Sequence, residues 1–257
     1  MAEQTIRFND GAAYERMMGV WSRIAGTVFL DWIAPAKGLS WIDIGCGNGA
    51  FTELVIERCA PAQIKGIDPS EGQLAYARSR PGATRAEFFQ GDAMALPFAD
   101  KSADVATMAL VLFFVPEPKK GLSEMIRVTR AGGTVAAYVW DLPGGGFPAD
   151  AIWKELAVIG KLVPQPPSAL ISEMSALRSL WTSELDNVDT KIIDVERNFA
   201  SFDDYWAACI GSSSIGTLVK SLSSDELARV QNGVRERLAK NGGRFTARAN
   251  AAKGKVR

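Results

Sequence analysis

Three acidic side chains stand at or just after the ends of segments that are expected to be strands: Asp43, Asp68 and Asp92. Ligands of open α/β proteins bind beyond the carboxyl ends of the strands. A carboxylate there accepts hydrogen bonds from ribose hydroxyls or a purine amino group and attracts an ammonium group, but it repels a diphosphate. The spacing therefore favours a ligand with an ammonium group near Asp43, ribose hydroxyls at Asp68 and a purine amino group at Asp92.

A glycine-rich turn comes directly after Asp43. Its residues are Gly45, Cys46, Gly47, Asn48 and Gly49. Glycines allow a strand to turn sharply into a helix while the backbone approaches a ligand closely. This turn also fits the pattern GxGxxG/A, in which the turn amides and the helix N-terminus receive the pyrophosphate of a dinucleotide. A nicotinamide-dependent oxidoreductase is thus an alternative, although the chain lacks a catalytic Tyr-x-x-x-Lys motif and Asp43 is badly placed for a diphosphate.

Each of these residues also has a purely structural interpretation. Asp43 can serve a turn, and Asp68, which precedes Pro69 and Ser70, can cap a helix. Their occurrence at three successive strand ends favours a ligand site over three independent caps. Cys46 is interpreted as a small residue that fills the turn, because the chain contains no histidine to activate its thiol.

The elements that must position these residues alternate along the chain. Strands are expected over residues 39–44, 63–67, 86–90, 105–113 and 134–140, and helices over 51–59, 70–80 and 119–130. Apolar strands alternating with helices predict a parallel sheet covered on both faces. Before this core, apolar residues at helical spacing from 10 to 35 predict one or two amphipathic helices. After it, we expect helices over 149–162, 168–181 and 202–240, and strands over 190–199 and 244–251 that pair with each other.

The expected organisation is a core with helical additions. The predicted parts are an N-terminal helical cap over residues 1–38, a ligand-binding core over 39–141, a helical lid over 142–187, and the last two strands with intervening lid helices over 188–257.

Composition narrows the function classes. Lys plus Arg equals Asp plus Glu at 29 each, so the whole chain lacks the positive field that nucleic acid or an anionic membrane attracts. Three cysteines without a CxxC pair suggest neither a disulfide framework nor a metal site. No signal-peptide pattern or membrane-length apolar run occurs, so we expect a cytoplasmic protein without a membrane span.

The motifs taken together resemble a known family. They are Asp43 to Gly49, Gly66-Ile67-Asp68-Pro69-Ser70, Gly91-Asp92-Ala93-Met94-Ala95-Leu96-Pro97-Phe98, and Glu124-Met125-Ile126-Arg127-Val128 with Gly132-Gly133. In this order they are similar to the class I S-adenosylmethionine-dependent methyltransferases (methyltransferase type 11), in the branch of the ubiquinone and menaquinone biosynthesis methyltransferases. The resemblance covers roughly residues 41–140, and the joint occurrence of the motifs is far more specific than any one of them.

The resemblance implies a Rossmann-like, doubly wound α/β fold with seven strands, the last of them antiparallel. It implies S-adenosyl-L-methionine as cofactor and S-adenosyl-L-homocysteine as product. It also implies roles for residues: the glycine turn under the methionine moiety, Asp68 with Pro69 and Ser70 at the ribose, and Asp92, Ala93 and Met94 at the adenine. Leu110 or Val111 is expected beside the cofactor, with Tyr14 and Trp21 of the leading helix covering it.

The expected reaction is methyl transfer to a small-molecule acceptor (EC 2.1.1.-). Phe114 and Trp140, at expected strand ends, and Asp141 are candidates for the acceptor pocket, and Asp141 and Tyr138 are the nearest candidates for a base. Many relatives carry a histidine near the fourth strand where this chain has Phe113 and Phe114, so no histidine mechanism is carried over and the catalytic residue stays open. The alternative of cofactor binding without turnover also stays open, and no motif predicts the acceptor or the oligomeric state.

Overall fold

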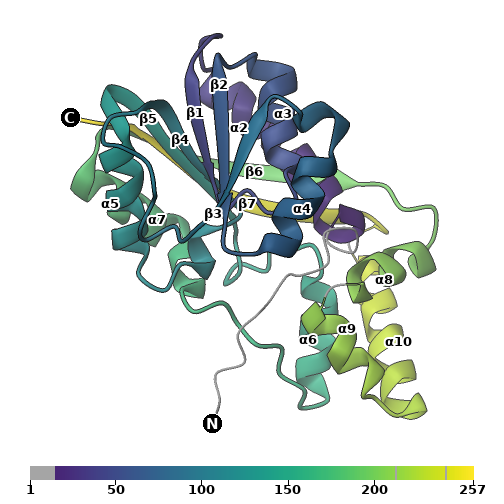
Figure 1. Ribbon diagram of the computed structural model, residues 1–257. Helices are drawn as coiled ribbons and strands as arrows, with labels where there is room; N and C mark the ends of the chain where they lie inside the picture. The colour runs from purple at the N-terminus through teal and green to yellow at the C-terminus, as the bar shows by residue number, and fades with distance from the viewer. Residues whose placement is uncertain (1–14, 212, 241) are drawn as a thin grey trace.

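A single mixed sheet forms the centre of the molecule. The computed structural model describes residues 15–211, 213–240 and 242–257, and within them seven strands pair in the order β3-β2-β1-β4-β5-β7-β6 (Figure 1). The strands are β1 Ser40–Ile44, β2 Gln63–Asp68, β3 Ala86–Gln90, β4 Ala103–Ala109, β5 Thr129–Trp140, β6 Asp186–Arg197 and β7 Phe245–Lys255. β7 pairs antiparallel with both β5 and β6, whereas the other pairings among the described strands are parallel. The predicted fold class and the pairing of the last two strands are confirmed.

Helices cover both faces of the sheet. They include α2 Val20–Ile33, α3 Ala50–Cys59, α4 Glu71–Ser79, α5 Pro118–Val128 and α7 Met174–Glu184. On β7, Lys253 Nζ donates to the carbonyl of Trp32 in α2, whereas a Cβ on the next residue, Gly254, would meet Leu185 at the end of α7. Because successive strand residues point to opposite faces, α2 and α7 lie on opposite sides of the sheet.

The two sides of the sheet are tied by large buried side chains. Trp21 of α2 packs edge-on against Trp140 of β5, with ring centroids 6.4 Å apart, and both side chains are at most 2% exposed. Tyr138, two residues earlier on β5, donates from its hydroxyl to the Ser22 carbonyl at 3.2 Å. On the other face, Trp181 of α7 donates from its indole nitrogen to the Val135 carbonyl at 3.3 Å. The leading helix is therefore part of the core of the protein.

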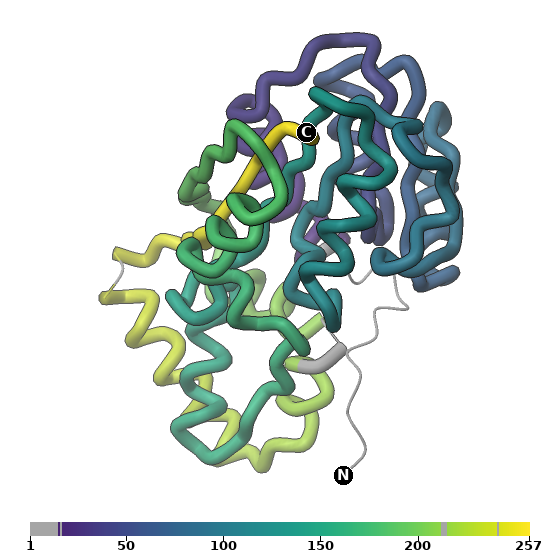
Figure 2. The backbone as a smooth tube through the Cα atoms, turned by 90° about the vertical axis from the view of Figure 1, so that its left-hand side faces the viewer, coloured from purple at the N-terminus to yellow at the C-terminus, as the bar shows by residue number. Residues whose placement is uncertain are grey.

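A group of helices lies beyond the sheet. It comprises α6 Asp150–Val158, α8 Phe202–Ile210, α9 Ser213–Lys220 and α10 Ser224–Lys240, and both views show it gathered at one end of the molecule (Figures 1 and 2). An ion pair between Arg237 of α10 and Glu155 of α6 joins two of its members. No helix in the described ranges combines the length and the apolar character needed to cross a bilayer.

Several predicted boundaries were wrong for local reasons. The strand predicted over 105–113 ends at Ala109, because Leu110 adopts a left-handed φ of 63° and the 3-10 turn η3 Leu112–Phe114 follows. The helix predicted over 149–162 ends at Val158, shortly before Gly160 with its φ of 77°. The 168–181 prediction is split into the 3-10 turn η4 Ala169–Ser172 and α7.

The helix predicted over 202–240 is three helices. Its last break lies at Ser223, whose hydroxyl accepts from the Glu226 backbone N–H while the Glu226 carboxylate accepts from the Ser223 N–H. This reciprocal capping box starts α10 as a new helix. At the other end of the chain, the leading helices appear as the π-helical turn η1 Glu15–Gly19 and α2, and Tyr14 lies outside the described residues.

Candidate functional site

The glycine turn joins β1 to α3, and its backbone uses glycine in two different ways. Gly45, Gly47 and Gly49 have φ values of 70°, 53° and 80°, a region that side chains disfavour. A Cβ on Gly45 would overlap the side chain of Val111, so this glycine is required for internal packing. A Cβ on Gly47 would meet no protein atom within 4 Å among the described contacts. Gly47 therefore faces open space at the carboxyl edge of the sheet.

Asp68, at the end of β2, connects the three acidic motifs. Its Oδ2 accepts from the Gly47 N–H and its Oδ1 from the Ser70 N–H, both at 2.9 Å. Its backbone carbonyl accepts from the Gly91 N–H at 3.2 Å. Burial raises the pKa of Asp68, and the two N–H groups oppose that rise. The three strand ends singled out in the sequence thus meet at one residue, two through the Asp68 carboxylate and its own turn and the third through the Asp68 main-chain carbonyl.

Ser70 continues this arrangement into the next helix. Its hydroxyl accepts from the Gln73 N–H at 3.4 Å and so caps α4. The structural interpretation of Asp68 as part of a helix start is confirmed, because its carboxylate accepts from the Ser70 N–H across Pro69 and Ser70 caps α4. Capping leaves acceptor capacity unused, since an ionised carboxylate offers about four lone-pair positions and two are taken here.

Asp43 lies beneath the turn and is fully buried. Its Oδ2 accepts from the Thr52 hydroxyl of α3 at 2.6 Å, whereas its Oδ1 has no hydrogen-bond partner within the described part of the chain. Burial raises the pKa of this carboxyl to about 7, with the Thr52 hydroxyl acting against the rise and Asp68 adding to it. A cationic group near the turn would favour the ionised form.

The buried carboxyl makes stability depend on pH. Because the pKa of Asp43 is about 7 in the folded protein, against 3.8 for an unperturbed aspartate, the folded chain binds this proton more tightly than the unfolded chain. The stabilisation that comes from protonated Asp43 is fully present below about pH 4 and is lost as the pH rises to 7. It amounts to a free energy of unfolding on the order of 4 kcal/mol. We expect Asp43→Asn, which keeps an acceptor for Thr52, to gain free energy of unfolding over the wild type at pH 8 but not at pH 4.5. Urea unfolding without cofactor measures this, and an equal difference at both pH values would contradict it.

The loop that carries Asp92 is fixed from the opposite side by α5. Asp92 is exposed, and its Oδ1 accepts from the Met94 N–H at 2.8 Å, which shapes the turn around Ala93. Further along, Glu124 of α5 accepts from the Leu96 N–H at 2.7 Å.

Arg127, also in α5, holds the same loop. It donates to the carbonyls of Leu96 and Phe98 and to the carboxylates of Asp100 and Glu124. The pairing with Arg127 lowers the pKa of Glu124. The fourth sequence motif therefore holds the third one in place.

The remaining predicted residues fall into two groups. Near the turn, the side chain of Val111 is packed against Gly45. Leu110, the other candidate, has its backbone N–H bonded to the Tyr138 carbonyl of β5 at 2.8 Å. Cys46 is buried, and burial raises the pKa of its thiol well above the usual range, which agrees with a packing role.

The candidates for the acceptor pocket lie at the end of β5 and in η3. Trp140 is buried, and its indole nitrogen has no hydrogen-bond partner in the described ranges. Phe114 is half-buried and packs against Phe113 with ring centroids 4.6 Å apart. Asp141 accepts from the Gly144 N–H at 3.0 Å and so closes the loop that follows β5. Tyr138, the other candidate base, is fully buried, and its hydroxyl donates to the Ser22 carbonyl of α2.

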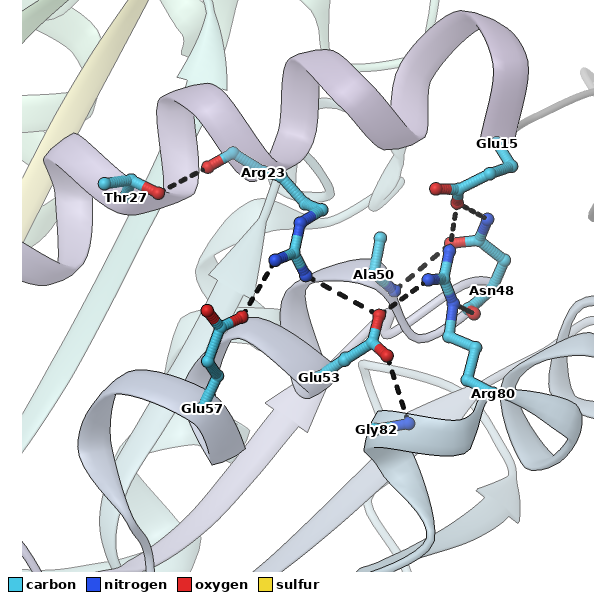
Figure 3. A network of polar contacts seen from close by, with 9 residues as sticks. All are labelled: Glu15, Arg23, Thr27, Asn48, Ala50, Glu53, Glu57, Arg80 and Gly82. Atoms are coloured by element: carbon cyan, nitrogen blue, oxygen red, sulfur yellow. Dashed lines mark hydrogen bonds and ion pairs between the residues drawn. The ribbon is translucent and has the colours of Figure 1, made fainter.

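Sequence reasoning missed a polar network behind the turn. Arg80, at the end of α4, donates from Nε to the Asn48 carbonyl at 2.6 Å and also pairs with Glu15 and Glu53 (Figure 3). An arginine near the end of a helix usually lies on the surface, so no sequence signal separates Arg80 from its neighbour Arg78. Thr52 was missed for a similar reason, because a threonine in a first helical turn has many roles.

The site fits the cofactor that the resemblance implies. Gly47 leaves space where a side chain would stand, Asp68 keeps acceptor positions for two hydroxyls, and Asp43 keeps a buried oxygen that favours a nearby cation. These three properties match a nucleoside that carries an amino acid ammonium group.

Comparison with known proteins gives the family. The model of the methyltransferase domain family matches residues 42–137. The chain is 33% identical over 181 residues to the demethylmenaquinone methyltransferase of Renibacterium salmoninarum, covering 68% of this chain and 71% of that one. It is also 33% identical over 115 residues to the ubiquinone/menaquinone biosynthesis C-methyltransferase UbiE of Roseobacter denitrificans, where it spans 46% of the relative.

Solved structures share the fold. The phosphoethanolamine N-methyltransferase 2 of Haemonchus contortus, in complex with S-adenosyl-L-methionine, aligns with a TM-score of 0.60 at 17% identity over 95% of this chain and 56% of that one. The [4+2]-cyclase SpnF aligns with a TM-score of 0.58 at 20% identity over 99% and 87%. The 181-residue similarity to the Renibacterium enzyme and the family match exclude the oxidoreductase alternative. This chain belongs to the class I S-adenosylmethionine-dependent methyltransferases, with S-adenosylmethionine as its cofactor.

Proposed function

We propose that this protein transfers the methyl group of S-adenosylmethionine to a small aromatic acceptor of the quinol type. The observation that carries the proposal is the 33% identity to a demethylmenaquinone methyltransferase over 181 residues, a stretch longer than the family match over 42–137. The similarity therefore includes residues outside the cofactor core. The balanced charge of the chain agrees with a neutral acceptor.

The proposed cofactor contacts follow the geometry of the turn. Asp68 accepts hydrogen bonds from the two ribose hydroxyls, and Pro69 and Ser70 shape the backbone around it. The residues of the glycine turn lie beneath the methionine moiety, with Asp43 favouring its ammonium group from below. The adenine lies by Asp92, Ala93 and Met94, and Trp21 contributes to the cover from the leading helix. The hydrogen bonds that Asp68 accepts from the N–H groups of Gly47, Ser70 and Gly91 support the assignments at the turn, at the ribose and at the start of the adenine loop.

The proposed acceptor site lies at the carboxyl end of β5. Half-buried Phe114 offers aromatic surface for a flat acceptor, whereas the ring of Trp140 is 1% exposed and would serve only through its indole N–H; Asp141 follows Trp140 in the chain. The unpartnered indole N–H of Trp140 is a donor that an acceptor oxygen would satisfy. In the ring of a quinol, the neighbouring hydroxyl makes the carbon nucleophilic, which reduces the need for a protein base.

Catalysis in this proposal depends mainly on alignment. Bound S-adenosylmethionine supplies a methyl group already activated by its sulfonium. The protein's residues then have to hold cofactor and acceptor in line and exclude water, and such positioning supplies roughly 7 to 11 kcal/mol in favourable cases. A chain without any histidine is suited to this mechanism, because no imidazole is needed.

The test is an acceptor comparison with S-adenosylhomocysteine formation as the readout. We expect formation with S-adenosylmethionine and reduced demethylmenaquinone, and none with the oxidised quinone or with phosphoethanolamine. Turnover of phosphoethanolamine would contradict the acceptor class. Cofactor binding without product for any acceptor would favour the binding-only alternative.

A further inference from the structure

A buried guanidinium lies directly behind the glycine turn. The Arg80 side chain is 10% exposed and donates in three directions: to the Asn48 carbonyl in the turn, to Glu53 of α3, and to Glu15 of η1. Figure 3 shows these three partners converging on Arg80 from three separate elements. The guanidinium thus joins α4, the turn with α3, and the N-terminal helix.

Glu15 closes the same cluster from the N-terminal side. Its Oε2 accepts from Arg80 and also from the Asn48 side-chain amide, at 2.7 Å for the latter. Asn48 in turn accepts on its Oδ1 from the Ala50 N–H at 3.2 Å. Both the main chain and the side chain of Asn48 are therefore fixed by charged groups, and charge-assisted hydrogen bonds are the strong ones.

The turn needs such a restraint. Three of its five residues are glycines with positive φ, and glycine loses more backbone freedom on ordering than any other residue. A turn that is ordered before the ligand arrives binds more tightly, because less conformational entropy is lost on binding. The Asn48 carbonyl stands between Gly47 and Gly49, so a bond at this point restrains Gly47, which faces the proposed ligand, and Gly49, which packs against Ala77 of α4.

We propose that Arg80 is a positioning residue for the cofactor, which fixes the glycine turn through the Asn48 carbonyl and is itself held by Glu15. Lysine cannot replace it, because a single ammonium group lacks the planar fork that donates to three acceptors at once. By thermodynamic linkage, a cofactor that favours the ordered turn also favours the docking of η1 onto it. This inference rests on the proposed cofactor contacts at the turn.

The test compares two arginine-to-lysine variants. We expect Arg80→Lys to weaken the binding of S-adenosylmethionine and S-adenosylhomocysteine about tenfold in calorimetry, and to raise the KM for the cofactor while kcat changes less than twofold. The matched control is Arg23→Lys: Arg23 pairs with Glu57 and Glu53 in the same network but does not contact the turn. Its affinity for both ligands should equal that of the wild type.

A second variant and a second readout cover a failure of Arg80→Lys to fold. Glu15→Gln removes the charge that holds Arg80 and should weaken cofactor binding in the same direction by a smaller factor. In the wild type, S-adenosylhomocysteine should slow hydrogen exchange of the η1 and α2 amides. Wild-type affinity in both Arg80→Lys and Glu15→Gln, or unchanged exchange in η1, would overturn the inference. No cofactor binding by the wild type would instead overturn the proposed contacts.

Discussion

Replacing Gly47 by alanine should remove cofactor binding while leaving the fold largely intact. The new Cβ meets no protein atom within 4 Å, so the cost to the fold is the left-handed φ of 53°, about 1 to 2 kcal/mol. The same methyl group stands in the space proposed for the methionine moiety. Forcing an extra methyl group into an occupied space costs up to about 3 kcal/mol, which is roughly a hundredfold in affinity, so calorimetry should show a loss of that order.

Gly38 offers a matched control for this experiment. It has a φ of 75° and no neighbour within 4 Å of a Cβ position, but it precedes β1 at the opposite end of the strand. Gly38→Ala should therefore lose a similar free energy of unfolding and bind the cofactor like the wild type. Equal cofactor affinity in the two variants would show that the space above Gly47 is not the ligand site.

Asp68→Ala should weaken cofactor binding by at least a hundredfold. The variant loses the two charge-assisted hydrogen bonds proposed to the ribose, each worth roughly 1.5 to 3 kcal/mol, and also the support that Asp68 gives to the Gly47 N–H. Because Ser70 still caps α4, the chain should remain folded with a modest loss of stability. Calorimetry with S-adenosylhomocysteine and thermal unfolding separate the two effects.

Asp104 supplies the control for Asp68. Its carboxylate likewise accepts from a backbone N–H, that of Ser40 at 2.8 Å, but at the amino end of β1. Asp104→Ala should lower stability without changing the cofactor affinity. If Asp68→Ala binds as tightly as Asp104→Ala, the ribose contact is assigned to the wrong residue.

Much of the fold followed from local patterns. The parallel strands were predicted because near-continuous apolar runs alternate with segments of helical spacing. The error at the end of β4 came from a residue whose conformation accompanies a tertiary contact. Leu110 is apolar and continues the strand pattern, yet its N–H is bonded to the Tyr138 carbonyl of β5 and its φ is positive.

The residues proposed to contact the ligand could be predicted from the sequence, but the residues that support them could not. The acids and glycines stood out by type and spacing, and the structure brings Gly47, Asp68 and Gly91 together. The supporting residues did not stand out, because Arg80 and Glu15 are 65 positions apart in the chain. Burial, which changes the chemistry of Asp43, is likewise a property of the packed molecule.

Calorimetric titration of the purified protein with S-adenosylmethionine and, separately, with the reduced nicotinamide dinucleotides tests the cofactor assignment most directly. We expect micromolar binding of S-adenosylmethionine and no binding of either dinucleotide. Binding of a dinucleotide alone would contradict the assignment, because the space above Gly47 and the acceptor positions of Asp68 would then serve a different ligand.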